Sequence, residues 1–204
     1  MKSVLISIQP YWVFLIIARK IGWDIPQNKS VEIRKTCPKE KTWNKKAIIY
    51  CTQDKKSFYR IPKEYQELMR PLIGKVVGEF VCDLIIPISI TYSDPDSRVA
   101  LKEFPYTCLT DKQIIDYLGN GKTGYGWYIS DLKIYDEPKE LKRFGKFECE
   151  YCGSKKECFA PETIYDCSLQ RIDTRLNNNM YRCDGDFLSL KRPPQSWCYV
   201  DETN

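Results

Sequence analysis

Three charged residues lie at the start of a predicted strand in which polar and apolar residues alternate. Residues 27–34 read QNKSVEIR, which sets Lys29, Glu32 and Arg34 among small and apolar side chains. Because residues two apart in a β-strand share a face, Glu32 and Arg34 are expected to point the same way. A carboxylate beside a guanidinium can bind a planar polar group, or it can form a structural ion pair. The segment therefore predicts a fixed group of charged side chains, with Lys29 where the chain enters the strand.

The chain contains no histidine. This excludes Ser-His-Asp and Cys-His catalysis by residues of this chain, and it excludes zinc sites with histidine ligands. Any general base must be a Glu, Asp, Lys, Cys or Tyr side chain, or a metal-bound water.

The spacing of these charged residues also resembles the motif of a known family. Its spacing resembles the G-x-K-x-x-E-x-R signature of the ASCH domain, a member of the PUA-like superfamily, with Gln27 in place of the leading Gly. Similar segments from the phage and bacterial branch of that family match residues 5–11, 74–80, 127–132 and 192–200. The likeness spans roughly residues 3–146 and 188–201. It implies an α+β, PUA-like fold: a small, partly open β-barrel with short peripheral helices.

The resemblance also implies a cleft beside the barrel with the charged trio as its floor. The predicted nucleotide-binding residues are Lys29, Glu32 and Arg34 as the floor, Tyr11 and Trp127 as aromatic walls, and Ser7, Gln195 and Ser196 as further hydrogen-bonding groups. A splayed base needs such a wall and convergent polar groups. The alternative makes Glu32 and Arg34 a buried ion pair and Trp127 a core residue. The open question is whether the trio converges on a hollow open to solvent.

Three functions are compatible with these residues. The first is binding of RNA or a modified nucleotide, with a regulatory role as one option. The second is hydrolysis of RNA or a modified nucleoside by Lys29 and Glu32, because related amidohydrolases act on acetylated cytidine and a nuclease has been described. Those amidohydrolases carry Thr where this chain has Glu32, so the sequence leaves enzyme activity open. The third is a phage-encoded module that binds a protein partner.

Residues 147–187 interrupt the family likeness and hold half of the ten cysteines. A C-x2-C pair can present two thiolates to one ion, and tetrahedral zinc needs two further ligands. The predicted set is Cys149, Cys152, Cys167 and Cys183, with Cys158 as an alternate for either of the last two. A structural zinc would help this insert fold. The alternatives are unpaired thiols and a redox-active Cys149/Cys152 pair.

Composition sets the remaining expectations. A chain of 204 residues suits one domain, residues 1–146 with 188–204, interrupted by the insert. Segment 28–46 carries seven Lys and Arg residues against two Glu, and this surplus equals the net charge of +5 of the whole chain. One interpretation is a local basic face that binds a polyanion, and the other is a solvated loop. Residues 4–18 are apolar but too short to span a bilayer, and no cleavage site follows. We therefore expect a cytoplasmic protein without a membrane partner; its oligomeric state is left open.

The predicted elements position these residues. Strands are expected over residues 3–8, 30–35, 46–52, 74–90, 125–135 and 196–200, with helices over 11–20, 62–69 and 111–118 and a helical turn over 138–144. Thr110 is the expected N-cap of the third helix, and Gly119 its end. Gly78 predicts a bulge or a close backbone approach within its strand.

Overall fold

The computed structural model describes residues 2–25, 27, 29–39, 43–89, 105–148, 158–159, 182–183 and 186–202. The chain divides into two compact units. The first comprises Met1–Glu140 with Pro193–Tyr199, and the second comprises Leu141–Arg192 with Val200–Asn204.

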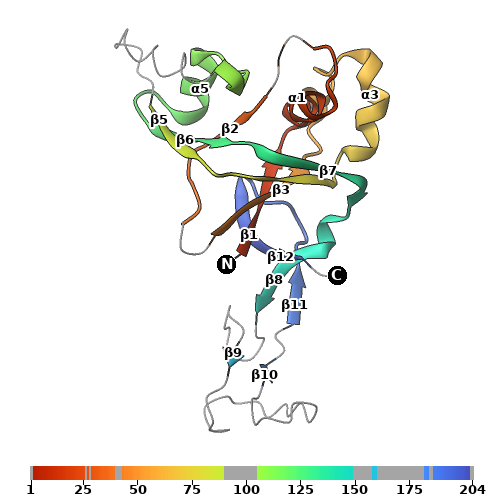
Figure 1. The fold of residues 1–204 in the computed structure, drawn as a ribbon, viewed down its shortest axis with the longest axis vertical. Helices are drawn as coiled ribbons and strands as arrows, with labels where there is room; N and C mark the ends of the chain where they lie inside the picture. The colour runs from red at the N-terminus through yellow and green to blue at the C-terminus, as the bar shows by residue number, and fades with distance from the viewer. Residues whose placement is uncertain are drawn as a thin grey trace. The chain divides into compact units, whose positions relative to one another are not determined.

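A mixed sheet forms the base of the first unit (Figure 1). Its order is β12-β1-β3-β4-β7, in which β1 is Lys2–Ile8, β3 is Trp43–Cys51, β4 is Val76–Val81, β7 is Ser130–Lys139 and β12 is Trp197–Glu202, of which the first residues belong to this unit. Strands β1 and β3 are parallel, and β3, β4 and β7 pair antiparallel. A parallel pair needs a crossover connection, and here the crossover contains helix α1, Pro10–Ile21.

A second, antiparallel sheet holds the charged motif. Its order is β2-β6-β5, with β2 at Val31–Arg34, β6 at Thr123–Tyr128 and β5 at Ile85–Ser89. One face of this sheet packs on helix α5, Asp111–Leu118, through a cluster that contains Ile33. The other face carries Trp127 into the main core of the unit. Strand β2 is thus covered on both of its faces, which is why all four of its residues are buried.

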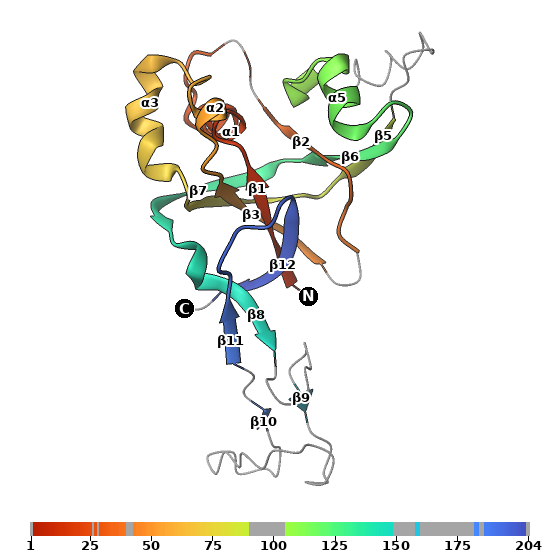
Figure 2. The ribbon, with the colours of Figure 1, turned by 180° about the vertical axis from the view of Figure 1, so that it is seen from behind.

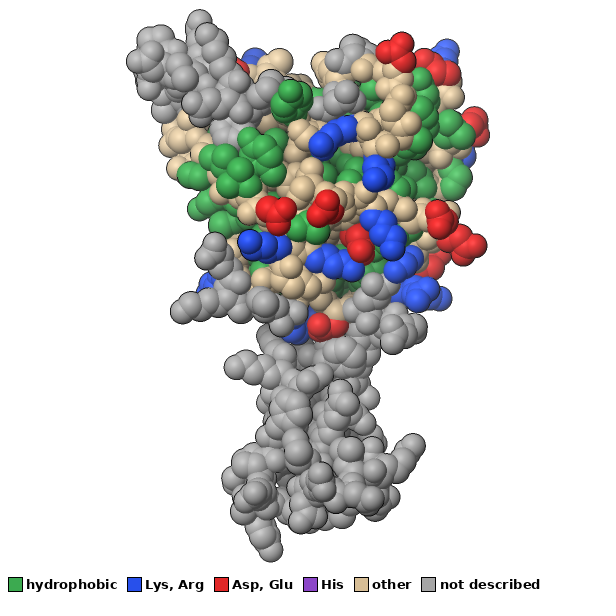
Figure 3. Space-filling view, viewed as in Figure 1, with side chains coloured by type: hydrophobic (Ala, Val, Ile, Leu, Met, Phe, Trp, Pro, Cys, Tyr) green, Lys and Arg blue, Asp and Glu red, His purple; other side chains and the backbone are tan. Residues whose placement is uncertain are grey.

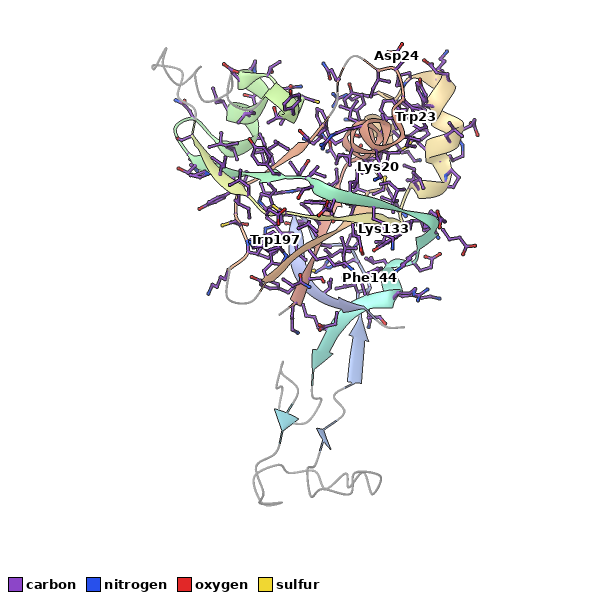
Figure 4. All side chains as sticks on the ribbon, viewed as in Figure 1. Lys20, Trp23, Asp24, Lys133, Phe144 and Trp197 are labelled. Carbon is purple, nitrogen blue, oxygen red and sulfur yellow. The ribbon has the colours of Figure 1, made fainter. Side chains whose placement is uncertain are left out.

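Helix α1 is held at both ends by sequence signals that the structure satisfies. Pro10 occupies its first turn, and Gly22 ends it with a left-handed φ of 74°. Helix α2 (Lys55–Phe58) lies next to α1 in Figure 2, and α3 (Lys63–Met69, followed by a 3-10 turn at Arg70–Leu72) lies next to α1 in both ribbon views (Figures 1 and 2). Phe14 of α1 and Trp23, which follows the helix, pack against Tyr65 of α3, so aromatic side chains join the two helices. Trp23 is labelled beside α1 and α3 in Figure 4.

The second unit contains a small antiparallel arrangement. After a 3-10 turn at Leu141–Arg143, β8 (Phe144–Glu148) pairs with β11 (Asp186–Ser189) and with the end of β12. The two-residue strands β9 (Cys158–Phe159) and β10 (Arg182–Cys183) pair with each other, with Cys183 opposite Cys158.

The expected α+β character is present, but the predicted small barrel is not closed: within the described residues the strands form separate open sheets. The reason is that two long strand predictions each break into two strands. Residues 74–90 form β4 and β5, and residues 125–135 form β6 and β7. At the breaks the backbone exchanges partners, because Tyr128 N–H donates to Leu84 O and Ile129 N–H donates to Ser30 O. Strands β5 and β6 therefore leave the larger sheet and join β2.

Several local predictions are confirmed. Thr110 caps α5 with a reciprocal capping box to Gln113. A Cβ atom on Gly78 would lie 2.4 Å from Lys133 O, so that position requires the close backbone approach that the sequence indicated. Across the ranges that the structure describes, no helix combines the length and apolar character needed to cross a bilayer.

Candidate functional site

Lys29 lies in the loop before β2 with its ammonium group surrounded by oxygen atoms. Its Nζ donates to Val31 O at 2.8 Å and to Thr107 O at 2.9 Å, and lies 3.2 Å from Glu32 Oε2. Thr107 belongs to a 3-10 turn, Pro105–Thr107. An ammonium has three N–H donors, and two of them make these hydrogen bonds, while Glu32 Oε2 lies within ion-pair distance. Lys29 therefore positions Glu32 by charge and ties β2 to this turn.

Glu32 and Arg34 form the second half of the trio. Arg34 Nη2 lies 3.0 Å from Glu32 Oε1 and donates to Ser7 O at 2.6 Å. Ser7 belongs to β1, so the guanidinium connects the smaller sheet to the larger one. Glu32 is thus flanked by two cations, and the trio carries a net charge of one positive.

The trio converges as the sequence predicted, but it is shielded from solvent. The exposed fractions of Lys29, Glu32 and Arg34 are 2%, 6% and 7%. The expected arrangement on a hollow open to solvent is not what the structure shows. The cause is that β2 lies between two packed layers, with α5 on one side and β1 on the other. The buried ion pair that the sequence offered as an alternative describes the contacts between Glu32 and Arg34.

Trp127 occupies the core rather than a solvent-facing wall. Its side chain is fully buried, with ring centroids 5.5 Å from Trp43 and 6.0 Å from Trp197. It is nevertheless close to the trio in the sheet, because Trp127 and Glu32 are register partners between β6 and β2. Directly opposed residues of an antiparallel pair have side chains on the same face. Trp127 and Glu32 therefore share one face, and so does Arg34, two residues along β2.

This shared face has unsatisfied polar atoms. In the described part of the chain, the buried side-chain polar atoms that lack a hydrogen-bond partner are Glu32 Oε2, Arg34 Nε, Trp127 Nε1 and Thr52 Oγ1. Three of these four belong to residues of the shared face. Glu32 Oε2 is within ion-pair distance of Lys29, but it accepts no hydrogen bond of good geometry. Each such atom costs about 1–3 kcal/mol when left unpaired, so the concentration at one place points to a polar ligand.

The other predicted site residues are spread around the trio. Ser7 is buried, and its hydroxyl donates to Pro194 O at 2.6 Å, while its N–H donates to Ser196 O at 2.9 Å. Ser196 therefore supports β1 through its backbone. Gln195 is exposed. Tyr11 is half-buried at the start of α1, where its ring packs against Trp12 at 5.0 Å.

The described basic residues of segment 28–46 lie in different surroundings. Of its charged residues, Lys29 and Arg34 are buried in the trio, and Lys46 pairs with Glu79 at 2.7 Å. Lys35 lies over the ring of Tyr117. On the face seen in Figure 3, basic and acidic side chains are interspersed. Part of the positive charge of this segment is therefore inside the protein, and a local polyanion-binding face stays a prediction.

Glu79 belongs to a separate cross-strand group. Its Oε2 accepts from Tyr135 Oη at 2.6 Å and pairs with Lys46. Burial raises the pKa of Glu79, but the hydrogen bonds from Lys46 and Tyr135 and the positive charges of Lys46 and Lys133 together outweigh burial, so the net pKa lies below its ordinary value. Glu79 therefore stabilises β3, β4 and β7 as a carboxylate.

Two of the described cysteines are buried in the core. Burial raises the pKa of Cys51 to about 12, and burial is also the main reason that the pKa of Cys82 is raised to about 12. Both are small apolar core residues. The residues predicted to bind zinc fall largely elsewhere: Cys149, Cys152 and Cys167 lie outside the described residues, and Cys158 and Cys183 are the register pair of β9 and β10.

Sequence reasoning missed three contributors. Thr107 holds Lys29 through its backbone, a contact that no side-chain pattern could indicate. Trp12 lies with its ring centroid 5.2 Å from Lys29 Nζ and 4.9 Å from Arg60 Cζ. Arg60 is the third contributor. In the sequence, the adjacent aromatic residues Tyr11 and Trp12 directly after Pro10 were the signal that could have indicated this group of cation–π contacts.

No protein-family model matches this chain, and no curated protein matches it. Among solved structures, it is similar to the crystal structure of ASCH from Zymomonas mobilis, with 18% identity over 69% of this chain and 74% of that one and a TM-score of 0.45. A tyrosine-to-phenylalanine variant of that protein matches with 16% identity, 69% and 77% coverage and a TM-score of 0.43. These structures carry the family name that the sequence resemblance suggested.

Proposed function

We propose that this protein binds RNA or a modified nucleotide by contacting the edge of one base with Glu32, Arg34 and Trp127. The observation that carries the proposal is the set of three buried, unpaired polar atoms on one face of the β2-β6 pair. Lys29 has a positioning role, because two of its three N–H donors bond Val31 O and Thr107 O and its ammonium lies 3.2 Å from Glu32 Oε2.

The chemistry of the unpaired atoms restricts the ligand. Arg34 Nε–H and Trp127 Nε1–H are donors, and Glu32 Oε2 is an acceptor. The complementary edge offers two acceptors and one donor. Cytosine and uracil present that number on their pairing edges, whereas the pairing edge of guanine presents one acceptor and two donors. A pyrimidine, free or within a single strand, is therefore the base class that this group of atoms fits.

Binding is expected to require a local rearrangement. The three groups are nearly inaccessible to solvent, so a base reaches them only when the shielding side chains move. A conformational step lowers the association rate constant below the usual range of about 10⁵–10⁷ M⁻¹s⁻¹. Slow, saturating association would be its kinetic signature.

The test is a titration of the purified protein with cytidine, uridine, guanosine and short single-stranded RNAs. Trp127→Phe removes the indole N–H and keeps an aromatic ring, and we expect it to weaken pyrimidine binding by about 1 kcal/mol, roughly fivefold. Thr52→Val is the matched control, because among the described residues it removes the unpaired buried atom that lies outside the group. Chromatography of the ligands after incubation distinguishes binding from hydrolysis. No pyrimidine binding, or equal weakening by both substitutions, would refute the assignment.

A second proposal concerns the cysteine-rich insert, which we propose holds one structural zinc ion. The supporting observation is the register of β9 and β10, which sets Cys158 directly opposite Cys183. Two cysteines distant in sequence are thus brought to one position, and the C-x2-C motif would supply the remaining thiolates. Metal analysis of the purified protein tests this proposal.

A further inference from the structure

We propose that Arg60 forms a phosphate-binding subsite beside the base site, so that the preferred ligand is a nucleotide or an RNA strand rather than a free nucleoside. This inference rests on the proposed function, because the phosphate is the one attached to the bound nucleoside.

The first observation is the way in which Arg60 is held. It is an exposed residue, yet its guanidinium carbon lies 4.1 Å from the centroid of the Tyr11 ring and 4.9 Å from that of the Trp12 ring. Two aromatic rings therefore fix an otherwise flexible side chain by cation–π contacts. A guanidinium that is already immobilised loses less conformational entropy when it binds a ligand.

The second observation is that the backbone supports this placement. The N-cap residue of α1 makes no side-chain cap, and Ser57 from α2 supplies the missing acceptor: Tyr11 N–H donates to Ser57 Oγ at 3.1 Å. Ser57 is 2% exposed. Arg60 N–H in turn donates to Ser57 O at 3.2 Å. One buried serine thus bonds both the backbone of Tyr11 and the turn that carries Arg60.

The third observation connects Arg60 to the trio. The indole ring of Trp12 is contacted by Arg60 and also by Lys29, at 5.2 Å from Nζ. Lys29 contacts Glu32, so two side chains, Trp12 and Lys29, connect Arg60 to Glu32. A phosphate on the ribose of a nucleoside bound at Glu32 therefore has Arg60 as the surface cation at the other end of these contacts.

The fourth observation concerns charge. In the described part of the chain no carboxylate makes an ion pair with Arg60, whereas Lys46, Arg70 and Lys112 are each paired. Its planar donors remain available for a bidentate contact with phosphate oxygens. Lys29 is 2% exposed and bonds two backbone oxygens, whereas Arg60 is exposed, so it is Arg60 that can bind the anion.

The test compares cytidine with its 5′-monophosphate and its 3′-monophosphate, or the uridine series if uridine binds better. For the wild-type protein we expect one of the two phosphates to raise the affinity about tenfold, the gain for one charged contact. In Arg60→Gln this gain should fall to about twofold, and Arg60→Lys should restore only part of it, because a lysine neither stacks nor binds phosphate bidentately. Lys63→Gln, which removes an exposed charge on α3, should keep the full gain.

The outcomes separate the two proposals. If the wild-type protein binds no pyrimidine nucleoside or nucleotide, both the proposed function and this subsite are wrong. If it binds the nucleoside but neither phosphate improves affinity, or the gain survives Arg60→Gln, only the subsite is wrong. As a further measure, the slope of log affinity against log salt for a short RNA should decrease by about 0.7 in Arg60→Gln. An unchanged slope would count against the subsite.

Discussion

Glu32→Gln is the substitution whose effect on folding follows most directly from the structure. In the native protein one carboxylate lies between two buried cations, with Lys29 Nζ at 3.2 Å and Arg34 Nη2 at 3.0 Å. Glutamine preserves the shape of the side chain but removes its charge. The buried group would then change from a net charge of one positive to two positive, with no compensating anion in the trio.

The expected cost is large. Removing one partner of a buried ion pair costs about 3–5 kcal/mol, because the remaining charge is left uncompensated. For a chain of this size, each kcal/mol corresponds to a fall in Tm of about 2–4 °C, so the melting temperature should fall by roughly 6–20 °C. Lys29→Met in the same background should recover part of the loss, because it removes one of the two uncompensated cations. We expect a coupling free energy of about 0.5–3 kcal/mol between the two positions.

Urea unfolding followed by tryptophan fluorescence measures these free energies. Glu67→Gln is the matched control, because Glu67 pairs with Arg70 on an exposed face, with 78% of its side chain accessible. That substitution should leave the unfolding midpoint unchanged. A loss below about 1 kcal/mol for Glu32→Gln, or no coupling with Lys29→Met, would refute the view that the trio is buried and mutually compensating.

Three further predictions concern other parts of the chain. Ser57→Ala should lower the free energy of unfolding by about 1 kcal/mol, measured by urea denaturation, because Tyr11 N–H loses its acceptor. Glu79→Gln should destabilise the protein at neutral pH and have progressively less effect as the pH falls through the lowered pKa of Glu79, since a depressed carboxyl pKa contributes stability only above that range; thermal melts from pH 3 to 7 test this. The purified protein should contain about one zinc per chain by elemental analysis, and the C-x2-C double serine variant of Cys149 and Cys152 should lose it; a metal-free wild-type protein would contradict the zinc proposal.

Local sequence patterns predicted much of the secondary structure. The Pro10 start of α1, the Thr110 capping box and the close approach at Gly78 each depend on a few neighbouring residues, so a pattern can reveal them. The alternation in β2 likewise predicted that Glu32 and Arg34 share a face.

Local sequence patterns do not reveal contacts between residues that are distant in sequence. The apolar runs 74–90 and 125–135 read as continuous strands, and nothing local shows that each exchanges hydrogen-bond partners midway. That exchange builds the second sheet in place of a barrel. The same exchange buries β2 on both faces, so the trio is shielded although its residue types suggested exposure. Arg60 escaped notice because its position depends on Ser57 contacting α1 across 46 residues of sequence.

The most direct test is to follow the five tryptophan indole N–H signals by ¹H–¹⁵N NMR during titration with a pyrimidine nucleotide. Trp43 and Trp197 already donate their indole N–H, to Lys46 O at 2.9 Å and Thr36 Oγ1 at 3.0 Å, whereas the buried indole N–H of Trp127 has no acceptor. We predict a downfield shift of the Trp127 signal, assigned by its loss in Trp127→Phe, with little change for Trp43 and Trp197. Saturating ligand that leaves the Trp127 signal unmoved would contradict the base-binding account.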